Sequence, residues 1–418
     1  MTRYLLLILF IGTMGSRALG LDLGLAPGVS IKNAMLYLVA TAIAIESSIS
    51  RNRKLDLLPV VLPMAILILY ASMSWLMIVV FLESPNYAAL GTLVRLKIKL
   101  FDQFLMLLVF CYGLVNWKDA LWLFKALTWT VIVGCLITVI DSFNIPDLGI
   151  ITTRDQDGRV EGIIGSAQEF GGLLAFVLPA ILAVWWKEAG LKKFAALVGV
   201  GLVLVSIMLS ASRGAMLGVV AGAIIAAFYL RQYLSPKVIA RATMLVAVAI
   251  AISTVVVLST DFGALLVSRL STGLESGDVQ AISSGRTAIW YAAWQQLAQY
   301  PIALITGMGW ETYFQSVGHR YATHSVYLDR LYNLGIIGLA LFVVSFVNAI
   351  VIMRRGLRNS PEQAAPILIA SVIGVIAFMI AMAFSDIHGA AIYIWAFTGV
   401  ALRIAVAGSV PEDPKRMV

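Results

Sequence analysis

Long uncharged apolar runs alternate with short polar connections along most of the chain. A helix needs roughly 20 mostly apolar residues to cross the hydrocarbon core of a bilayer. Runs that meet this length without a charged residue predict secure membrane spans at Leu57 to Leu82, Phe194 to Ser212, Gly214 to Leu230, Ala242 to Thr260, Leu331 to Met353 and Gln363 to Ser385. The pattern therefore predicts a membrane-embedded helical protein.

Further apolar runs are shorter and need charged flanks that reach the interface. They are Tyr4 to Ser16, Asn33 to Ile45, Gln103 to Trp117, Ala126 to Ile140, Phe170 to Trp186 and Ile387 to Leu402. Together, the runs predict an all-α polytopic membrane protein of about twelve transmembrane helices, since a span takes roughly 20 residues. We expect Tyr4 to Ser16 to be a retained span rather than the core of a signal peptide, because Arg17 and Leu19 make a poor cleavage site.

Composition and chain order agree with this architecture. Hydrophobic residues make up 61% of the chain and charged residues 12%, about half the ~25% that is usual in soluble domains. We divide the chain into N-terminal transmembrane helices (1–162), helices with a polar turn (163–260), a long polar loop with amphipathic helices (261–330), and C-terminal helices with a tail (331–418). Cys111 and Cys135 fall inside predicted spans and indicate small apolar positions, not redox chemistry.

Lysine and arginine cluster in every second connection, which sets the orientation. With Arg3 inside, the cytoplasmic connections hold Arg51, Arg53, Lys54, Lys118, Lys187, Lys192, Lys193, Arg231, Lys237, Arg241, Arg354, Arg355 and Arg358, and the tail adds Lys415 and Arg416. Both termini are then cytoplasmic, and the loop from Asp261 to Tyr327 faces outward, which in a double-membrane bacterium is the periplasm. The net charge of +8 thus reflects orientation, not nucleic-acid binding. Arg95, Lys97 and Lys99 are an outward exception, which we assign to an amphipathic helix beside anionic headgroups.

The outward connections carry polar residues suited to an anionic substrate. Arg213 lies in Leu209-Ser-Ala-Ser-Arg-Gly214 between two apolar runs, where a helix start and a guanidinium together can bind phosphate. A cation that anchors a hairpin is the alternative. Arg286 is in the first turn of a helix expected to run to about Gln299, with Ser283 or Ser284 as its cap. A cation is unfavourable at a helix start, so we expect a bound anion there, or pairing with Asp278 or Glu275.

His324 lies where the long loop re-enters the membrane. A neutral imidazole can accept a proton from a hydroxyl group, although a histidine that only bonds a neighbouring loop is the alternative. His319 and His324 are not at helical ligand spacing, and no thiolate or carboxylate cluster surrounds them, so we expect neither a metal nor a cofactor. Asp329, Glu311 and Asp386 are the acidic residues nearest these groups. Asp386 and His388, between the last two spans, can orient an acceptor or simply cap those helices, and Glu169 at the entry of its span is a further functional candidate.

These motifs together resemble the O-antigen ligase and polymerase superfamily. They are Ser212-Arg-Gly-Ala215 between spans, Gly285-Arg286 with Trp290 in the outer loop, Gly307-x-Gly309, and His324 followed by Tyr327-Leu and Gly335-Ile-Ile-Gly-Leu339. The resemblance covers roughly Val160 to Leu402. Ser325 stands where that family usually has asparagine after the histidine.

The resemblance implies a metal-independent, inverting glycosyltransferase of the membrane-embedded C type in the inner membrane. It implies that Arg213 and Arg286 bind the diphosphate of an undecaprenyl-diphosphate-linked glycan and that His324 assists the acceptor hydroxyl. Ser325 and Tyr327, with Asp329, Asp386 and Glu169, are further candidates for orienting the acceptor. That acceptor is lipid A core in a ligase or a second lipid-linked glycan in a polymerase.

Two other classes compete with the transferase. A twelve-span secondary transporter is the main alternative, and such proteins usually show matching halves and broken helices with polar midplane sites. We find no clear internal repeat, and the long loop does not divide the chain at its middle. A scaffolding membrane protein is less favoured, because it has no need of Arg213, Arg286 and His324 on one side.

Overall fold

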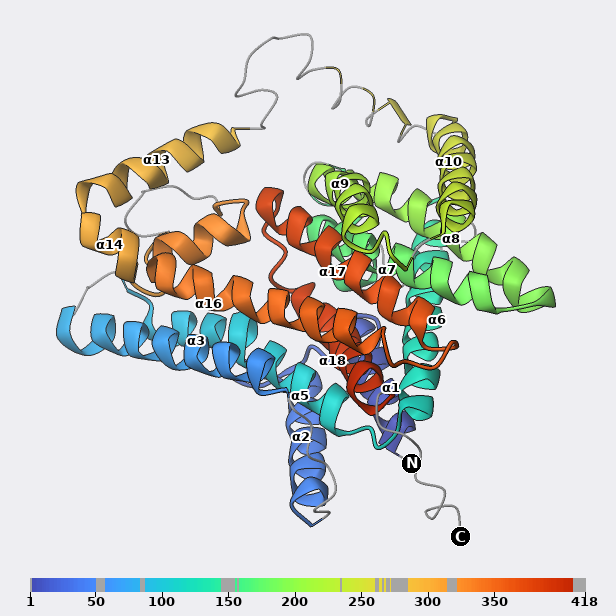
Figure 1. Ribbon diagram of the computed structural model, residues 1–418. Helices are drawn as coiled ribbons and strands as arrows, with labels where there is room; N and C mark the ends of the chain where they lie inside the picture. The colour runs from blue at the N-terminus through green and yellow to red at the C-terminus, as the bar shows by residue number, and fades with distance from the viewer. Residues whose placement is uncertain are drawn as a thin grey trace.

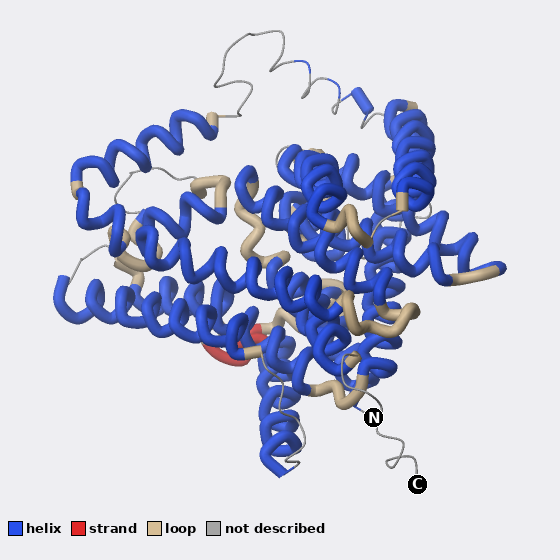
Figure 2. Tube along the Cα trace, viewed as in Figure 1, coloured by secondary structure: helices blue, strands red, loops and turns tan. Residues whose placement is uncertain are grey.

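The computed structural model describes residues 2–49, 57–82, 87–143, 155, 158–233, 235–259, 263–264, 267, 271, 285–313 and 322–408. Helices dominate this part of the chain (Figure 2), and the strands β1 (Gly24–Ala26) and β2 (Val29–Ser30) form one small antiparallel pair. The architecture is therefore all-α, as predicted.

The helices follow the order of the apolar runs (Figure 1). They are α1 (Thr2–Met14), α2 (Ile31–Ile49), α3 (Leu58–Met77), α4 (Ala89–Leu96), α5 (Asp102–Tyr112), α6 (Trp117–Ser142), α7 (Ala167–Lys187), α8 (Gly190–Ser210), α9 (Arg213–Tyr229), α10 (Pro236–Leu258), α13 (Arg286–Gln299), α14 (Pro301–Thr306), α16 (Val326–Gly356), α17 (Ala365–Phe384) and α18 (Ala391–Ala407). Short π-helical turns follow α3 (Ile78–Leu82) and join α4 to α5 (Lys97–Phe101), and a 3-10 turn precedes α7 (Gly162–Ile164).

Among the described residues, 6 helices are long and apolar enough to cross a membrane. They are Leu58–Phe81, Trp117–Ser142, Ala167–Trp186, Gly190–Ser210, Val326–Gly356 and Ala365–Phe384. Four of them coincide with runs that the sequence marks as secure. The helix from Trp117 is longer than its uncharged run because Lys125 sits at an end of the bundle, where it pairs with Glu188 at 2.7 Å. The total of about twelve spans stays a prediction.

Small residues let α9 and α17 approach closely. Gly214, Gly218 and Gly222 recur at one-turn spacing along α9, and a Cβ added to Gly222 would lie 2.6 Å from the Cα of Ala377 on α17. Ala381, one turn further along α17, faces Gly218. Membrane helices associate through such small-residue faces because their backbones then come into van der Waals contact. This packing fixes the start of α9, and Arg213 with it, against the end of α17.

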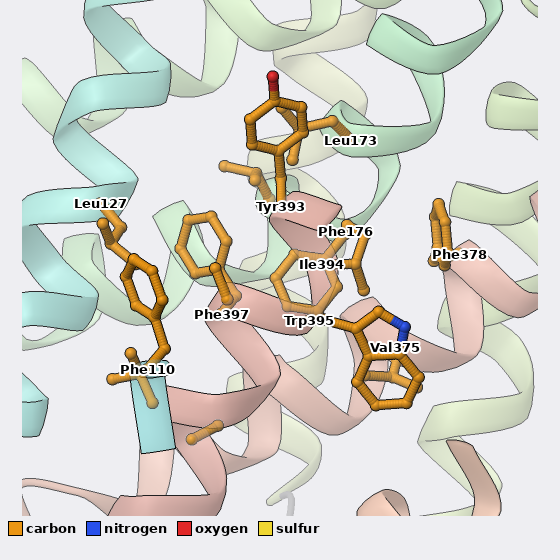
Figure 3. Close-up of a cluster of buried hydrophobic side chains, with 14 of the residues drawn as sticks. Phe110, Leu127, Leu173, Phe176, Val375, Phe378, Tyr393, Ile394, Trp395 and Phe397 are labelled. Carbon is orange, nitrogen blue, oxygen red and sulfur yellow. The ribbon is translucent and has the colours of Figure 1, made fainter. Parts of the chain in front are cut away.

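Aromatic side chains fill the centre of the bundle around α18. Figure 3 shows Phe397 between Phe110 and Phe176, with Trp395 on the side of Phe378. Phe397 contacts Phe176 with ring centroids 5.3 Å apart, and Trp395 stacks on Phe346 of α16 at 4.3 Å. Helix α18 is therefore buried at the centre of the bundle, and its neighbours pack around it.

The connections that we assign to the outer side meet at one end of the bundle. Arg17 pairs with Glu161 at 3.2 Å, and the amide of Val160 donates to the Leu209 carbonyl at 3.1 Å. Lys99 pairs with Glu311 at 2.7 Å. Contacts at the opposite end include the pair of Arg3 with Asp119 at 2.7 Å and the cation-π contact of Arg354 with Tyr229. We call the end of the bundle that contains Glu161, Leu209 and Glu311 the site end.

Helix α16 is broken at Gly335, near the site end. Gly335 has φ 64° and ψ −169°, and an added Cβ would collide with the backbone of Ile305 and Gly307. The turn after α14 bridges the break, because the amide of Met308 donates to the Tyr332 carbonyl at 2.8 Å. The segment Val326 to Leu334 is thus a short separate helix in front of the long apolar part of α16.

Candidate functional site

Arg213 is the first residue of α9, as the sequence predicts for a turn between two spans. Ala211 adopts a left-handed conformation with φ 44°, which reverses the chain between α8 and α9. The hydroxyl of Ser212 accepts a hydrogen bond from the amide of Ala215 at 3.4 Å and caps the new helix. Gly171 of α7 packs against Ser212, where a side chain would collide. The turn that carries Arg213 is therefore held from two sides.

Arg286 is the first residue of α13, which ends at Gln299 as predicted. The expected serine cap is wrong: Gly285 occupies the cap position with φ 77°, a conformation that glycine adopts without strain. Ser283 and Ser284 lie outside the described residues, as do the expected partners Asp278 and Glu275. The guanidinium of Arg286 donates to the carbonyl of Phe384 at the end of α17.

His324 precedes the short helix at the start of α16 and has φ 51°. Its neighbour Thr323 is fixed by α13, because the indole of Trp290 donates to the Thr323 carbonyl at 2.8 Å. The Nδ1 atom of His324 is buried and has no hydrogen-bond partner among the described residues. Burial, and next the charge of Arg286, lower the pKa of His324 below its ordinary value of 6.5. The imidazole is therefore neutral at pH 7 and able to accept a proton.

The structure brings Arg213, Arg286 and His324 together from three separate elements. Gly214 packs directly on Ser385, the residue after the Phe384 carbonyl that binds Arg286. Burial lowers the pKa of Arg286, and the charge of Arg213 lowers it further. Two positive charges that lie close together repel each other unless an anion lies between them. The geometry thus suits a dianionic ligand with His324 at its edge.

Ser325 and Tyr327 follow His324 and serve the local fold. The Ser325 hydroxyl caps α16 by accepting from the amide of Leu328 at 3.4 Å. The hydroxyl of Tyr327 donates to the Met379 carbonyl of α17 at 2.7 Å. Tyr327 also lines an apolar groove between α16 and α17 whose other walls are Val347, Ile350, Ile376, Met379, Ile380 and Ala383. This groove ends beside the cations, because Ala383 precedes Phe384.

Asp329 belongs to a buried network of charged and polar groups behind the site. Its carboxylate accepts from Asn333 at 2.9 Å and lies 3.1 Å from Nε2 of His388. Arg330, which can only donate, contacts Nδ1 of His388 at 3.2 Å, so that Nε2 carries the proton and donates to Asp329. Nε2 is also 3.3 Å from Asp386. The network therefore connects the start of α16 to the loop that carries Asp386.

Lys99 and Glu311 close this network on the other side. Glu311, whose side chain is fully buried, pairs with Lys99 at 2.7 Å and with Arg95 at 3.0 Å. Lys97 pairs with Asp102 at 2.8 Å. The expected assignment of these cations to lipid headgroups is therefore wrong for Lys97 and Lys99, because protein carboxylates already neutralise them.

Glu169 binds the loop between α17 and α18. Its carboxylate accepts from the amide of Gly389 at 2.9 Å, and an added side chain at Gly389 would displace it. Since Asp386 is in the same loop, Glu169 fixes the position of this candidate through the backbone. Its contacts are with the protein, and a role toward an acceptor stays a prediction.

Sequence reasoning missed Arg159, which lies among the other cations. It follows Gly158 in the connection before α7. Its charge adds a smaller contribution to the lowered pKa of both Arg286 and His324, for which burial is the largest cause. The alternation of connections places it on the same outer side as Arg213, and that signal was sufficient to find it.

The comparisons with known proteins point to one family. No curated protein matches the chain. A family model described as O-antigen ligase matches residues 198–343, a range that contains Arg213, Arg286, His324 and the break at Gly335. This match, on the residues that form the site, supports the resemblance to the O-antigen ligase and polymerase superfamily.

Proposed function

We propose that the protein is an inner-membrane glycosyltransferase that moves a glycan from undecaprenyl diphosphate to an acceptor hydroxyl on the periplasmic face. The convergence of Arg213, Arg286 and a neutral His324 at one end of the bundle carries this proposal. The proposal takes the predicted orientation, with about twelve spans and both termini in the cytoplasm, so that the site end faces the periplasm. ATP is absent there, so the donor must arrive already activated.

The reaction breaks one bond and forms one bond at the anomeric carbon of the donor sugar. The acceptor oxygen bonds to that carbon from the face opposite the diphosphate, and its proton passes to His324. The electron pair of the breaking bond stays on the phosphate oxygen, and undecaprenyl diphosphate leaves. Arg213 and Arg286 stabilise the charge that grows on this leaving group, which lowers the barrier. Metal independence is part of the proposal.

The apolar groove beside the cations supports a lipid-linked donor. Its walls between α16 and α17 are almost wholly apolar, and it begins at Tyr327 and Ala383 next to the site. An isoprenoid chain laid in this groove has its diphosphate at Arg286. A soluble nucleotide sugar has no use for such a groove.

Single substitutions test the proposal in the native host. Arg213→Gln, Arg286→Gln and His324→Ala are each expected to abolish or strongly reduce surface glycan at normal protein levels. Arg354→Gln at the opposite end, which contacts Tyr229, is the matched control and is expected to leave glycan unchanged. Normal glycan amount and length in all three site variants contradicts the assignment.

The product of a deletion strain identifies the acceptor. Full-length chains stranded on the carrier lipid indicate a ligase that uses lipid A core. Single units attached to lipid A core, with no long chains, indicate a polymerase that extends a second lipid-linked glycan. A normal glycan profile refutes both.

A further inference from the structure

The segment from Thr287 to Trp310 contains no charged residue, although it belongs to the long connection before α16. Its helices α13 and α14 bury one face against the protein and expose large apolar side chains on the other. The exposed side chains are Tyr291, Trp294, Tyr300, Ile302, Leu304 and Ile305. A helix face that meets water normally carries charged or polar residues, so this face is better suited to lipid.

The exposed face of α14 continues the exposed surface of α3. The hydroxyl of Tyr70 donates to the Thr306 carbonyl, at the end of α14, at 2.7 Å. Tyr70 lies near the middle of the span Leu58–Phe81, more than about 15 Å of helix from either end. Leu69 beside it and Met73 one turn further are exposed on the same span. The end of α14 therefore contacts α3 at a position within the bilayer.

After α14 the chain turns back along α3 toward the site end. The amide of Trp310 donates to the Ser74 hydroxyl at 3.0 Å, one turn beyond Tyr70, and the hydroxyl of Tyr87 donates to the Trp310 carbonyl at 2.6 Å. Figure 1 shows α14 turning sharply away from α13 toward α16. The segment from Pro301 to Trp310 thus enters and leaves on the same side of the bundle.

The turn after α14 has the paired backbone that a position inside the bilayer requires. Lipid offers no hydrogen bonds, so irregular backbone at that depth must be satisfied within the protein. The amide of Gly307 donates to the Ala303 carbonyl at 2.7 Å, and that of Gly309 donates to the Asn333 carbonyl at 3.1 Å. The amide of Met308, between them, is bonded to α16 as well.

We propose that Pro301 to Trp310 is a re-entrant segment in the leaflet at the site end, with the exposed side chains of α14 among lipid acyl chains. Trp294 and Tyr300 then lie at the headgroup boundary, where the apolar ring and polar tip of such residues are both accommodated. Because the segment has no charge, hydrophobic contact holds it in neutral and anionic lipid alike. Since Arg286 begins α13, this seat also fixes its depth. The inference does not depend on the proposed function.

Spin labels on single introduced cysteines test this placement in the full chain in nanodiscs. Ile302→Cys, at a position 74% exposed, reports on α14. Leu69→Cys on α3, at a position 60% exposed, is the lipid reference, and Asn359→Cys in the exposed turn before α17 is the water reference. Cys111 and Cys135 are buried, and the protein without an added cysteine controls for their labelling.

The labels are compared by their collision rates with oxygen, which dissolves in lipid, and with a polar nickel chelate, which stays in water. The oxygen-to-nickel ratio at Ile302→Cys is expected to match that at Leu69→Cys. It is expected to exceed the water reference at least about tenfold, because moving a polar solute into hydrocarbon costs more than the free energy of a tenfold change. Ile305→Cys is expected to agree with Ile302→Cys, and Trp294→Cys to lie between the two references.

Three results overturn the proposal. Nickel collision rates at Ile302→Cys and Ile305→Cys that equal the water reference show that α14 faces water, as it does if the aromatic face takes a glycan instead. Low rates with both reagents show that a second copy of the chain covers the face. A ratio that falls to the water reference in nanodiscs of neutral lipid shows attachment by charge. None of the labels replaces Arg213, Arg286 or His324, so each result is independent of the proposed function.

Discussion

Glu311 offers the sharpest test of the buried network. It lies outside the groups that we place at the donor, yet its fully buried carboxylate holds Lys99 at 2.7 Å and Arg95 at 3.0 Å. Glu311→Gln keeps the volume of the side chain and removes only the charge. Lys99, whose side chain is 15% exposed, is then left with Asp329 at 3.8 Å as its acidic partner in the described part of the chain.

The expected loss is large because the pair is buried. Removing one partner of a buried ion pair costs about 3–5 kcal/mol, since the other charge stays in a poorly solvated place. Arg95 contributes little to this loss, because half of its side chain is exposed and water replaces its partner. We therefore expect Glu311→Gln to lower the free energy of unfolding by about 3–5 kcal/mol, with most of the loss at Lys99.

The loss is measured by titrating the purified full chain in mixed micelles with a denaturing detergent and recording the fraction that unfolds. Glu188→Gln is the matched control. Its pair with Lys125 has the same 2.7 Å separation but is partly exposed, at 18% and 31%, so we expect a cost of at most about 1 kcal/mol. Lys99→Met combined with Glu311→Met is expected to recover part of the loss. Equal costs for Glu311→Gln and Glu188→Gln refute the reasoning.

Other consequences of the structure are testable in the same preparation. Asp386 raises the pKa of His324, so Asp386→Asn is expected to move the acidic limb of the rate profile to lower pH, and a limb that stays or rises contradicts their coupling. Gly335→Ala places a Cβ against backbone atoms at φ 64°, and we expect a loss of at least about 2 kcal/mol in unfolding free energy, whereas Gly201→Ala, which meets nothing within 4 Å, is expected to be tolerated. Ala383→Trp fills the groove and is expected to raise KM for a polyprenyl-linked donor more than for a short-chain farnesyl-linked donor; equal effects remove the groove as the site of the lipid chain.

The arrangement of connections was predictable because charge and hydropathy act locally. Positive residues in alternate connections indicated which of them share an end of the bundle, and Arg213, Arg286 and His324 do meet there. The bounds of α13 were predictable from the spacing of its apolar residues. The sequence also contains the signal for the close packing of α9 on α17, because Gly214, Gly218 and Gly222 repeat every fourth residue, although this packing was not predicted from it.

The buried charges were not predictable, because their partners come from distant parts of the chain. Lys99 and Glu311 are 212 residues apart and are buried only because each neutralises the other. In sequence, Arg95, Lys97 and Lys99 form a cluster of cations without a neighbouring acidic residue before Asp102, and only the tertiary fold supplies the carboxylate of Glu311. The glycine cap of α13 was likewise missed, since serine is the commoner choice and Gly285 is selected by a left-handed backbone.

The break at Gly335 and the buried network together determine where His324 lies. The break separates the short helix Val326 to Leu334, which follows His324, from the long apolar part of α16. Asp329 and Arg330 in this short helix are fixed instead by His388 and Lys99. The imidazole is thus positioned by the same loop that carries Asp386. It follows that substitutions in the network disturb the base and its acidic neighbour together, whereas substitutions in the long part of α16 act mainly through the groove.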